Sequence, residues 1–410
     1  MSLIKDFQKD EEYALLCCGR SANPYPVYHR LREQDPVHWS EEFNGWLLTR
    51  YDDVLAAFSD SRLESAPRID SYMNQLPERT RSDVEPLYQH YATWLTNLDP
   101  PSHTRLRNLV HKAFTPRVVN GLRPFIEQAV EEIIDSKKST GCMEVLSELA
   151  CPLPSAVIAK VLGVPARDWA QFQIWSQEIS DFVGTGRPQS DKAKLAQQSM
   201  LQMSAFVERI ARQRVEDPEA NLIAALATVA ADGDRLSEHE LVGMCVFLLV
   251  AGHETTMALI ANGLLALLQH PDELSRLRQS PALMSSAVEE MLRYESPLQH
   301  QIRVAREYLE IEGRPIQQGQ RVVLLLGAAN RDPAQFRHPD DFDITREPNR
   351  HLAFGHGIHF CIGAPLARLE ATVVMQILLG RLPRLGMADQ ELRWRHHTSN
   401  RHVRSLEICF

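Results

Sequence analysis

Hydrophobic residues recur at helical spacing along most of the chain. Residues 24–34 show this period after a proline-rich start, and the pattern is almost entirely helical over residues 52–300. Residues 36–40 and 45–50 alternate instead and flank an Asn-Gly pair, which predicts a short hairpin. A second stretch with strand character covers residues 302–326. These patterns predict a mainly α protein with a small β region.

Two segments lack a regular pattern. Residues 66–98 hold three prolines, and residues 331–360 combine prolines with glycines. Irregular segments of this length inside a compact domain are usually functional, and a bound cofactor is one candidate for what organises them. No repeat or flexible linker divides the sequence, so we expect a single domain over residues 1–410.

The longest predicted helix lies between Ser237 and Pro271. Ser237 and Glu240 form a capping box, and the apolar run that follows ends at the proline. Its length of about 33 residues corresponds to about 50 Å, and a globule of this chain length has a diameter of roughly 55 Å. The helix is therefore expected to cross the whole protein.

The centre of this helix is polar. Between Leu241 and Leu268 the only formal charge is that of Glu254, which is followed by two threonines. Burying an unpaired carboxylate is costly, and Gly252 costs about 1 kcal/mol relative to alanine in a helix interior. Such a group of local violations is expected at a functional site.

Three other interpretations fit this helix in part. Its length suits a membrane span, but the polar centre and the lack of a second span disfavour one. His253 and Glu254 begin a zinc-binding HExxH motif, but Met257 stands where the second histidine is required. A buried polar network, with Thr255 bonding back to the Ala251 carbonyl, stays open and is compatible with function.

A second cluster of unusual residues surrounds Cys361. Residues 354–363 read Phe-Gly-His-Gly-Ile-His-Phe-Cys-Ile-Gly, and a helix is predicted from Ala364 to Leu379. The glycines let the backbone wrap closely around the sulfur. Backbone amides and a helix N-terminus both stabilise a thiolate, which is a good ligand for a soft metal.

Two alternatives remain for this loop when it is considered alone. His351, His356, His359 and Cys361 supply four possible ligands for a structural zinc ion. A buried cysteine without any metal is the other alternative.

Composition narrows the class of protein. The formal net charge is −9, with 44% hydrophobic and 24% charged residues, which is typical of globular proteins and disfavours a nucleic-acid binder. The seven cysteines show no repeated spacing, which predicts reduced thiols rather than a disulfide framework. The first residues contain no apolar signal segment, so we expect a cytoplasmic location.

Taken together, the motifs resemble those of the cytochrome P450 haem-thiolate enzymes, and most of all the bacterial hydroxylases that tailor polyketides and macrolides. Residues 354–363 match the Phe-Gly-x-Gly-x-His-x-Cys-x-Gly signature of the family, and residues 251–256 match its oxygen-activation motif. Glu290 and Arg293 match its Glu-x-x-Arg pair, and residues 99–107 match its haem-clamp helix. All four motifs occur in the order of the family. The resemblance implies the cytochrome P450 fold, with the long central helix crossing over the haem.

The resemblance also implies a haem b cofactor, with Cys361 as the thiolate ligand of the iron. A thiolate ligand pushes electron density toward the iron and favours O–O cleavage. Phe354 would pack beside the thiolate, and Ala251 and Gly252 would lie at the haem. Buried propionates need charge-assisted partners. The residues that resemble the propionate ligands of the family are His103, Arg107, Arg303 and His359.

Thr255 and Glu254 resemble the catalytic acid–alcohol pair of the family. Thr255 would hydrogen-bond dioxygen and the waters that bring protons to it, and Glu254 would connect those waters to solvent. Glu290 and Arg293 would have a structural role, because in the family they pair with an arginine that corresponds to Arg346. That contact would fix the loop that carries Cys361.

The expected partners are O2, a hydrophobic small-molecule substrate that is free or attached to a carrier protein, and a separate electron donor. No ferredoxin-like or flavin-binding segment is apparent, so ferredoxin and ferredoxin reductase would deliver electrons from NAD(P)H. Residues 100–126 hold five basic side chains and no acid. Arg105, Lys112 or Arg117 would dock an acidic ferredoxin, although such a run can also be a solvated basic face.

The substrate pocket is expected to be largely apolar, with Val246, Phe247, Val250 and Leu298 in its wall and no evident charged anchor. The segments expected to line it are residues 66–98, 168–190, 246–250, 297–302 and 398–400.

We therefore interpret the chain as a monooxygenase that inserts one oxygen atom from O2 into a hydrophobic biosynthetic intermediate, by hydroxylation or epoxidation. One alternative is a P450 relative that performs peroxide-driven oxidation, desaturation or coupling. The pair Glu254 and Thr255 disfavours it, because peroxide users often lack this pair. A non-catalytic P450-like binding module is a further alternative, and the presence of both Cys361 and Thr255 disfavours that one.

Overall fold

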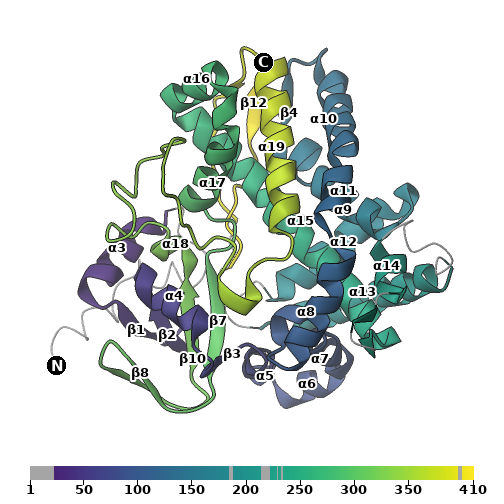
Figure 1. Cartoon of the computed structure of the whole chain (residues 1–410), viewed down its shortest axis with the longest axis vertical. Helices are drawn as coiled ribbons and strands as arrows, with labels where there is room; N and C mark the ends of the chain where they lie inside the picture. Colours follow the sequence, from purple (N-terminus) through teal and green to yellow (C-terminus); the bar gives the residue numbers. More distant parts are fainter. Residues whose placement is uncertain (1–22, 184–187, 214–221, 229, 232–233, 396–398) are drawn as a thin grey trace.

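The computed structural model describes residues 23–183, 188–213, 222–228, 230–231, 234–395 and 399–410. Helices form most of this part of the chain and surround one long central helix, while a smaller β region lies to one side (Figure 1). The first half contains α3 (Tyr25–Gln34), α4 (Tyr51–Ser59), α5 (Pro67–Met73), α6 (Glu78–Asp83), α7 (Glu85–Ala92), α8 (Ser102–Ala113), α9 (Pro116–Gly121), α10 (Arg123–Lys137), α11 (Pro152–Leu162), α12 (Trp169–Val183) and α13 (Ser190–Gln213). The second half contains α14 (Leu222–Thr228), α15 (Glu238–Gln269), α16 (Pro271–Gln279), α17 (Met284–Tyr294), α18 (Leu326–Ala329) and α19 (Ala364–Arg381).

The long helix predicted from the capping box is α15, with 32 residues. The Ser237 hydroxyl accepts from the Glu240 amide, and the Glu240 carboxylate accepts from the Ser237 amide, so both halves of the box form. The helix is long and apolar enough to cross a membrane, but 78% of its most apolar window is buried in the fold. It packs against α11, α12, α13, α17 and α19, so α15 is the core helix of the protein.

The main sheet has five strands in the order β1-β2-β10-β7-β3. The predicted hairpin is confirmed: β1 (Val37–Ser40) and β2 (Gly45–Leu48) are antiparallel, and Asn44 adopts a positive φ of 45° in the turn. The predicted second β stretch is also confirmed and provides β7 (His300–Ala305), β8 (Leu309–Ile311), β9 (Arg314–Ile316) and β10 (Arg321–Leu325). The short strand β3 (Leu63–Glu64) pairs with β7 and brings residues 63–68 next to that strand.

The expectation that residues 66–98 are irregular is wrong. They form α5, α6, α7 and the short 3-10 helix η1 (Leu95–Asn97). The prolines had suggested breaks, but Pro67 and Pro86 stand in the first turns of α5 and α7, where proline lacks only a hydrogen bond that the helix would not make. The other irregular segment is confirmed, because residues 331–360 contain no helix or strand apart from the one-turn η5 (Gly357–His359).

The expectation that all cysteines are reduced thiols is contradicted at one place. Cys142 and Cys409 form a disulfide across 267 residues of sequence. They lie opposite each other in β4 (Cys142–Glu144) and β12 (Glu407–Cys409), with the Cα atoms 4.1 Å apart. Such a pairing depends on the register of two strands that are distant in sequence, so cysteine spacing could not reveal it. Among the described cysteines, Cys151, Cys245 and Cys361 are free.

Candidate active site

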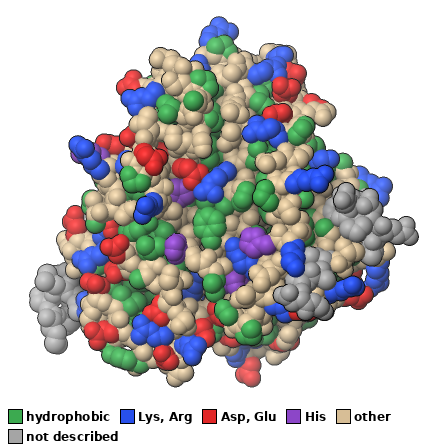
Figure 2. All heavy atoms as spheres, in the orientation of Figure 1, with side chains coloured by type: hydrophobic (Ala, Val, Ile, Leu, Met, Phe, Trp, Pro, Cys, Tyr) green, Lys and Arg blue, Asp and Glu red, His purple; other side chains and the backbone are tan. Residues whose placement is uncertain are grey.

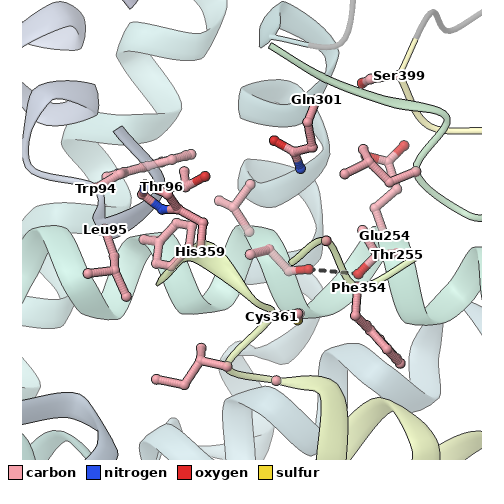
Figure 3. A pocket seen from close by; sticks show the side chains of 18 of the residues that line it. Trp94, Leu95, Thr96, Glu254, Thr255, Gln301, Phe354, His359, Cys361 and Ser399 are labelled. Atoms are coloured by element: carbon pink, nitrogen blue, oxygen red, sulfur yellow. Dashed lines mark hydrogen bonds between the residues drawn. The ribbon is translucent and has the colours of Figure 1, made fainter. Parts of the chain in front are cut away.

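The polar centre of α15 opens onto a cavity of about 430 Å³. Ala251 is exposed there and Thr255 is half-buried, whereas most residues of the helix are buried. The Thr255 hydroxyl donates to the Ala251 carbonyl at 2.9 Å, so the predicted back-bond is present (Figure 3). Gly252 also lines the cavity. The side of α15 that carries Ala251 and Thr255 therefore faces open space in the middle of the molecule.

Glu254 is 2% exposed and is held by a polar network. It accepts a hydrogen bond from Asn400 Nδ2 at 2.7 Å and further bonds from the Ser180 hydroxyl and from Arg395. Arg395 also bonds to Asp181, whose side chain is 40% exposed. A buried carboxylate is stable in its charged form when it is paired and hydrogen-bonded. The network also links the cavity wall to solvent through two side chains that the sequence did not single out.

The loop before α19 presents Cys361 to the same cavity. Gly355 and Gly357 adopt φ values of 70° and 69°, which side chains other than glycine rarely tolerate. The Cys361 amide donates to the Phe354 carbonyl at 2.9 Å and closes the loop. Cys361 and Thr255 both line this cavity, one from the loop before α19 and the other from α15 (Figure 3). Sulfur and hydroxyl thus border one space.

The surroundings of Cys361 have opposing effects on the pKa of its thiol. Burial raises its pKa, while the backbone amides of Gly363 and Ala364 and the charge of Arg107 act to lower it. These amides are the ones expected from the position of the cysteine just before a helix. Among the described residues, no group of three His, Cys, Asp or Glu side chains could hold a metal ion, and His351 is bound to Glu289 at 3.1 Å. The geometry therefore gives no support to the zinc alternative.

Four side chains expected at haem propionates gather near this loop. His103 is 1% exposed, and neither of its ring nitrogens has a hydrogen-bond partner. Its ring lies 4.2 Å from that of His359, whose Nε2 is 3.2 Å from the Ser65 hydroxyl. Arg107 donates to the Phe360 carbonyl at 2.6 Å. Arg303 is 3% exposed, and burial lowers its pKa to about 10.

This group of side chains fits an anionic cofactor. Arg107 and Arg303 form no ion pair within the described part of the chain, and His103 offers two unsatisfied nitrogens at the same place. Buried charges and polar groups are normally paired. A planar group that carries carboxylates at one edge and accepts a thiolate at its centre meets both requirements. The residues present therefore fit haem.

Phe354 lies against the guanidinium of Arg368, with 4.6 Å from the ring centre to the guanidinium carbon. Arg368 in turn donates two hydrogen bonds to Glu289, at 2.7 and 2.8 Å, and Glu289 also binds His351. Burial acts to raise the pKa of Glu289, but Arg368 and His351 outweigh it and lower this pKa to about 2. Phe354 is thus fixed at the cavity by a charged support behind it.

Glu290 and Arg293 form the predicted pair on α17, with two hydrogen bonds of 2.7 Å and both side chains fully buried. Arg346 reaches Glu290 at 3.2 Å, as expected. Arg293 also donates to the carbonyls of Asn330, Pro339 and Asp341. These contacts pin the irregular segment 331–360 to α17, so the pair supports the loop rather than entering the cavity.

All five segments expected around the substrate contribute to the cavity wall. Phe247, Val250 and Leu298 line it as predicted, and other members include Ile69, Tyr72, Trp94, Leu95, Ser180, Val183, Pro297, Gln301, Ser399 and Asn400. Val246 is a wrong prediction, because it is fully buried in the core. Thr398 lies outside the described residues. The sequence made no charged anchor evident, and the structure places Arg68 and Arg321 in the cavity wall. No spacing or motif in the sequence signals either arginine.

The basic side chains of residues 100–126 have two kinds of surroundings. Lys112 and Arg117 are exposed, and so are the apolar side chains of Ile358 and Phe360 in the cysteine loop segment. Figure 2 shows Lys and Arg side chains beside hydrophobic ones in the middle of the face that carries α8 and α19. Arg105, in contrast, binds Asp234 at 3.1 Å and also Glu240. It is occupied by the N-terminal region of α15 and is not available as an unpaired charge.

Comparisons with known proteins identify this architecture. The family described as "Cytochrome P450" matches residues 73–383. The "Biotin biosynthesis cytochrome P450" of Bacillus subtilis is 39% identical over 95% of this chain and 96% of its own length, and "Cytochrome P450 monooxygenase PikC" of Streptomyces venezuelae is 41% identical over 95% and 91%. The crystal structure of P450BioI in complex with an acyl carrier protein ligated to hexadec-9Z-enoic acid aligns with a TM-score of 0.88 at 38% identity, and the alignment covers 97% of this chain and 99% of the other.

These relatives are haem enzymes, and the fold is the one that the resemblance implied. The haem b cofactor with a cysteine thiolate ligand is a property of the whole family, and its bacterial members receive electrons from redox partners. The chain belongs to the cytochrome P450 family of haem-thiolate monooxygenases.

Proposed function

We propose that the chain inserts one oxygen atom from O2 into a hydrophobic biosynthetic intermediate, with Cys361 as the thiolate ligand of haem b. When bound, the haem supplies the activation of dioxygen. The observation that carries the proposal is that Cys361 and Thr255 line one cavity, with His103, Arg107, Arg303 and His359 gathered beside it.

The chain's own residues have distinct tasks in this proposal. Thr255 holds a hydroxyl at the cavity side of α15, where it can exchange its bond to the Ala251 carbonyl for a bond to a ligand. Glu254 is placed to pass protons, because its carboxylate is linked through Arg395 to the partly exposed Asp181. Phe354 and the glycines of residues 354–363 shape the thiolate side. Ala251 and Gly252 line the cavity on the same stretch of α15.

We also propose that electrons arrive from ferredoxin and its NAD(P)H-dependent reductase. The proposal is supported by the exposed basic side chains of Lys112 and Arg117, and by the exposed apolar side chains of Ile358 and Phe360, which adjoin Cys361 in the sequence. An acidic partner would be attracted there. For location we retain the cytoplasm, because the single helix of sufficient length among the described residues is a buried core helix.

The substrate class follows from the apolar wall and from the relatives. Relatives are named for polyketide biosynthesis, biotin biosynthesis and the 6-deoxyerythronolide B hydroxylase reaction, and one related structure holds an acyl carrier protein. A polyketide-like or acyl substrate, free or attached to a carrier, suits a cavity with this lining. Hydroxylation or epoxidation at a carbon held on the Thr255 side of the haem is the proposed reaction.

An absorption spectrum of the reduced protein with CO tests the proposal. We expect the band shift that a thiolate ligand produces, and we expect Cys361→Ser to lose it. The described free cysteines Cys151 and Cys245 provide matched controls, and their serine variants should retain the shift. A Cys361→Ser variant that keeps the thiolate spectrum would show that another residue is the ligand. Turnover with hydrogen peroxide alone, without NAD(P)H and ferredoxin, would favour the peroxide-driven alternative.

A further inference from the structure

Arg68 is a cation on the cavity wall that is surrounded by neutral acceptors. Its Nε donates to Asn97 Oδ1 at 2.6 Å, and its terminal nitrogens donate to Thr96 Oγ1 at 3.0 Å and to Gln301 Oε1 at 3.4 Å. Guanidinium has five N–H groups. One N–H on each terminal nitrogen therefore remains for a further partner.

These contacts hold the guanidinium in place before any ligand arrives. Asn97 is 5% exposed, and its Nδ2 donates to the Tyr91 carbonyl at 2.8 Å, so its oxygen is directed at Arg68. Figure 3 shows Thr96 and Gln301 reaching toward the cavity from different segments. Arg68 is hydrogen-bonded to both. A binding group fixed in this way loses little side-chain freedom when it binds a ligand.

No acid among the described residues pairs with Arg68. Burial and the charge of Arg303 lower the pKa of Arg68 to about 9, and the charge of Asp99 only partly offsets them. The Asp99 carboxylate is occupied by the amides of Ser65 and Ala66. A buried cation without an anionic partner is costly, which points to an anion that the protein itself does not supply.

The cavity contains more positive charge than the cofactor can match. Four arginines line it: Arg68, Arg107, Arg303 and Arg321. Of the carboxylates in the wall, Glu254 is bound to Arg395, and burial raises the pKa of Glu370, which disfavours its charged form. Even with both haem propionates and the nearby Asp99 counted, one cation is left unmatched.

We propose that Arg68 binds the carboxylate of an aliphatic acid substrate and thereby orients its chain in the apolar part of the cavity. The inference rests on the proposed function, because the haem must occupy the space beside Cys361 for Arg68 to stand at the substrate end. The two free N–H groups match the two oxygens of a carboxylate. A substrate joined to a carrier by a thioester has no such carboxylate, so Arg68 selects the free acid. A haem propionate offers the same chemistry and is the other possible source.

Spectral titration of the ferric haem-loaded protein distinguishes these sources. The probes are tetradecanoic acid and its methyl ester, which share the same chain and differ in the charge and in one methyl group. The wild type should bind the acid more tightly. Arg68→Gln should weaken binding of the acid by about 10- to 100-fold, as expected for loss of a charged hydrogen bond, and should leave the ester unchanged. Arg68→Lys should restore part of the preference for the acid.

The control is Arg306→Gln, which removes an arginine with a 54% exposed side chain outside the cavity and should alter neither affinity. Transfer of haem to apomyoglobin and the reduction potential are measured on the same variants. Faster haem loss in Arg68→Gln, with an unchanged acid-to-ester ratio, would assign Arg68 to a propionate and overturn the substrate assignment. A wild type that binds the two probes equally, or binds neither, would also overturn it. A wild type without the thiolate CO band would instead refute the proposed function itself.

Discussion

Thr255 shows how a single side chain can have two roles in one helix. Its hydroxyl satisfies the Ala251 carbonyl at 2.9 Å while the same side chain faces the cavity. A threonine that bonds to the preceding turn can release that bond when another acceptor or donor arrives. The structural interpretation and the catalytic interpretation of Thr255 therefore describe the same arrangement.

Thr255→Ala should keep the haem spectrum and the spin-state response to substrate, because Thr255 is not among the side chains that would hold the haem. Proton delivery should suffer, and positioned proton donors typically contribute about 100-fold or more to a rate. We expect product formation to fall by roughly that factor, while consumption of NAD(P)H continues and hydrogen peroxide appears. Product and peroxide are measured per NAD(P)H consumed. Thr255→Ser keeps the hydroxyl and should restore coupling, and an unchanged product yield in the alanine variant would contradict the role.

At the scale of elements, Arg293 on α17 holds an otherwise irregular segment. Both members of the pair Glu290 and Arg293 are fully buried, and Arg293 reaches three carbonyls of residues 330–341 as well. Segments without their own hydrogen-bond ladder need such external donors. The position of the cysteine loop thus depends on Glu290 and Arg293 of α17, although neither side chain lines the cavity.

Arg293→Lys should destabilise the protein although the charge is kept. Lysine cannot reproduce the planar fork that serves Glu290 and the carbonyls at once, and disrupting a buried ion pair costs about 3 kcal/mol or more. We expect that loss in the free energy of unfolding and a lower haem content after purification. Urea unfolding and the ratio of haem to protein absorbance measure the two effects. Arg276→Lys, at a half-exposed pair with Glu273, is the matched control. Equal stability of both variants would contradict the structural role.

The contact between α7 and α13 predicts a dependence of stability on pH. His90 is buried, its Nε2 lies 2.6 Å from the Ser204 hydroxyl, and burial together with nearby His239 lowers its pKa to about 4. The unfolded chain takes up this proton near pH 6.5. His90 therefore costs no stability above about pH 6.5, and stability falls as the pH drops from there toward 4, by at most about 1.4 kcal/mol per pH unit.

Urea unfolding between pH 7 and pH 5 measures this slope. His90→Gln should reduce this slope by an amount close to the uptake of one proton on unfolding. The reason is that glutamine cannot titrate, although it can still bond to Ser204. His29→Gln, at a half-buried position on α3, is the control for removing a histidine elsewhere. If His90→Gln left the slope at the wild-type value, the acid sensitivity would have to come from other groups.

At the scale of the whole molecule, local sequence patterns predicted the helices and strands better than they predicted which distant segments contact one another. The helix that begins at Ser237 and the hairpin at Asn44 carry complete local signals, and both form as expected. The short helices of residues 66–98 begin at prolines, which the sequence offers equally as breaks. The cavity arginine Arg68 and the link between Arg395 and Glu254 depend on segments brought together by the fold. The motif residues were found because chemistry restricts their types, whereas contacts between distant segments leave no such local trace. The single-domain organisation over residues 1–410 stays a prediction.

The disulfide between Cys142 and Cys409 is the longest-range covalent link among the described residues and closes the chain from β4 to the C-terminal strand. Just before β12 lie Ser399 and Asn400, which line the cavity, and the Ser399 carbonyl accepts from the Gln299 amide at 2.7 Å. Closing a long loop restricts the unfolded chain and typically stabilises a protein by about 2–4 kcal/mol. Holding β12 in place should therefore also hold the adjoining cavity wall.

Cys409→Ser should lower the free energy of unfolding by about that amount and weaken binding of substrate by loosening the segment at Asn400. The thiolate CO band should persist, because Cys361 is untouched. Unfolding in urea with and without a thiol reductant separates the effects: reductant should destabilise the wild type to the level of the variant and leave the variant unchanged. Thiol titration of the urea-unfolded wild type should find two fewer groups than the seven cysteines of the sequence. A titration that finds all seven, together with no response to reductant, would show that the two strands pair without the covalent bond.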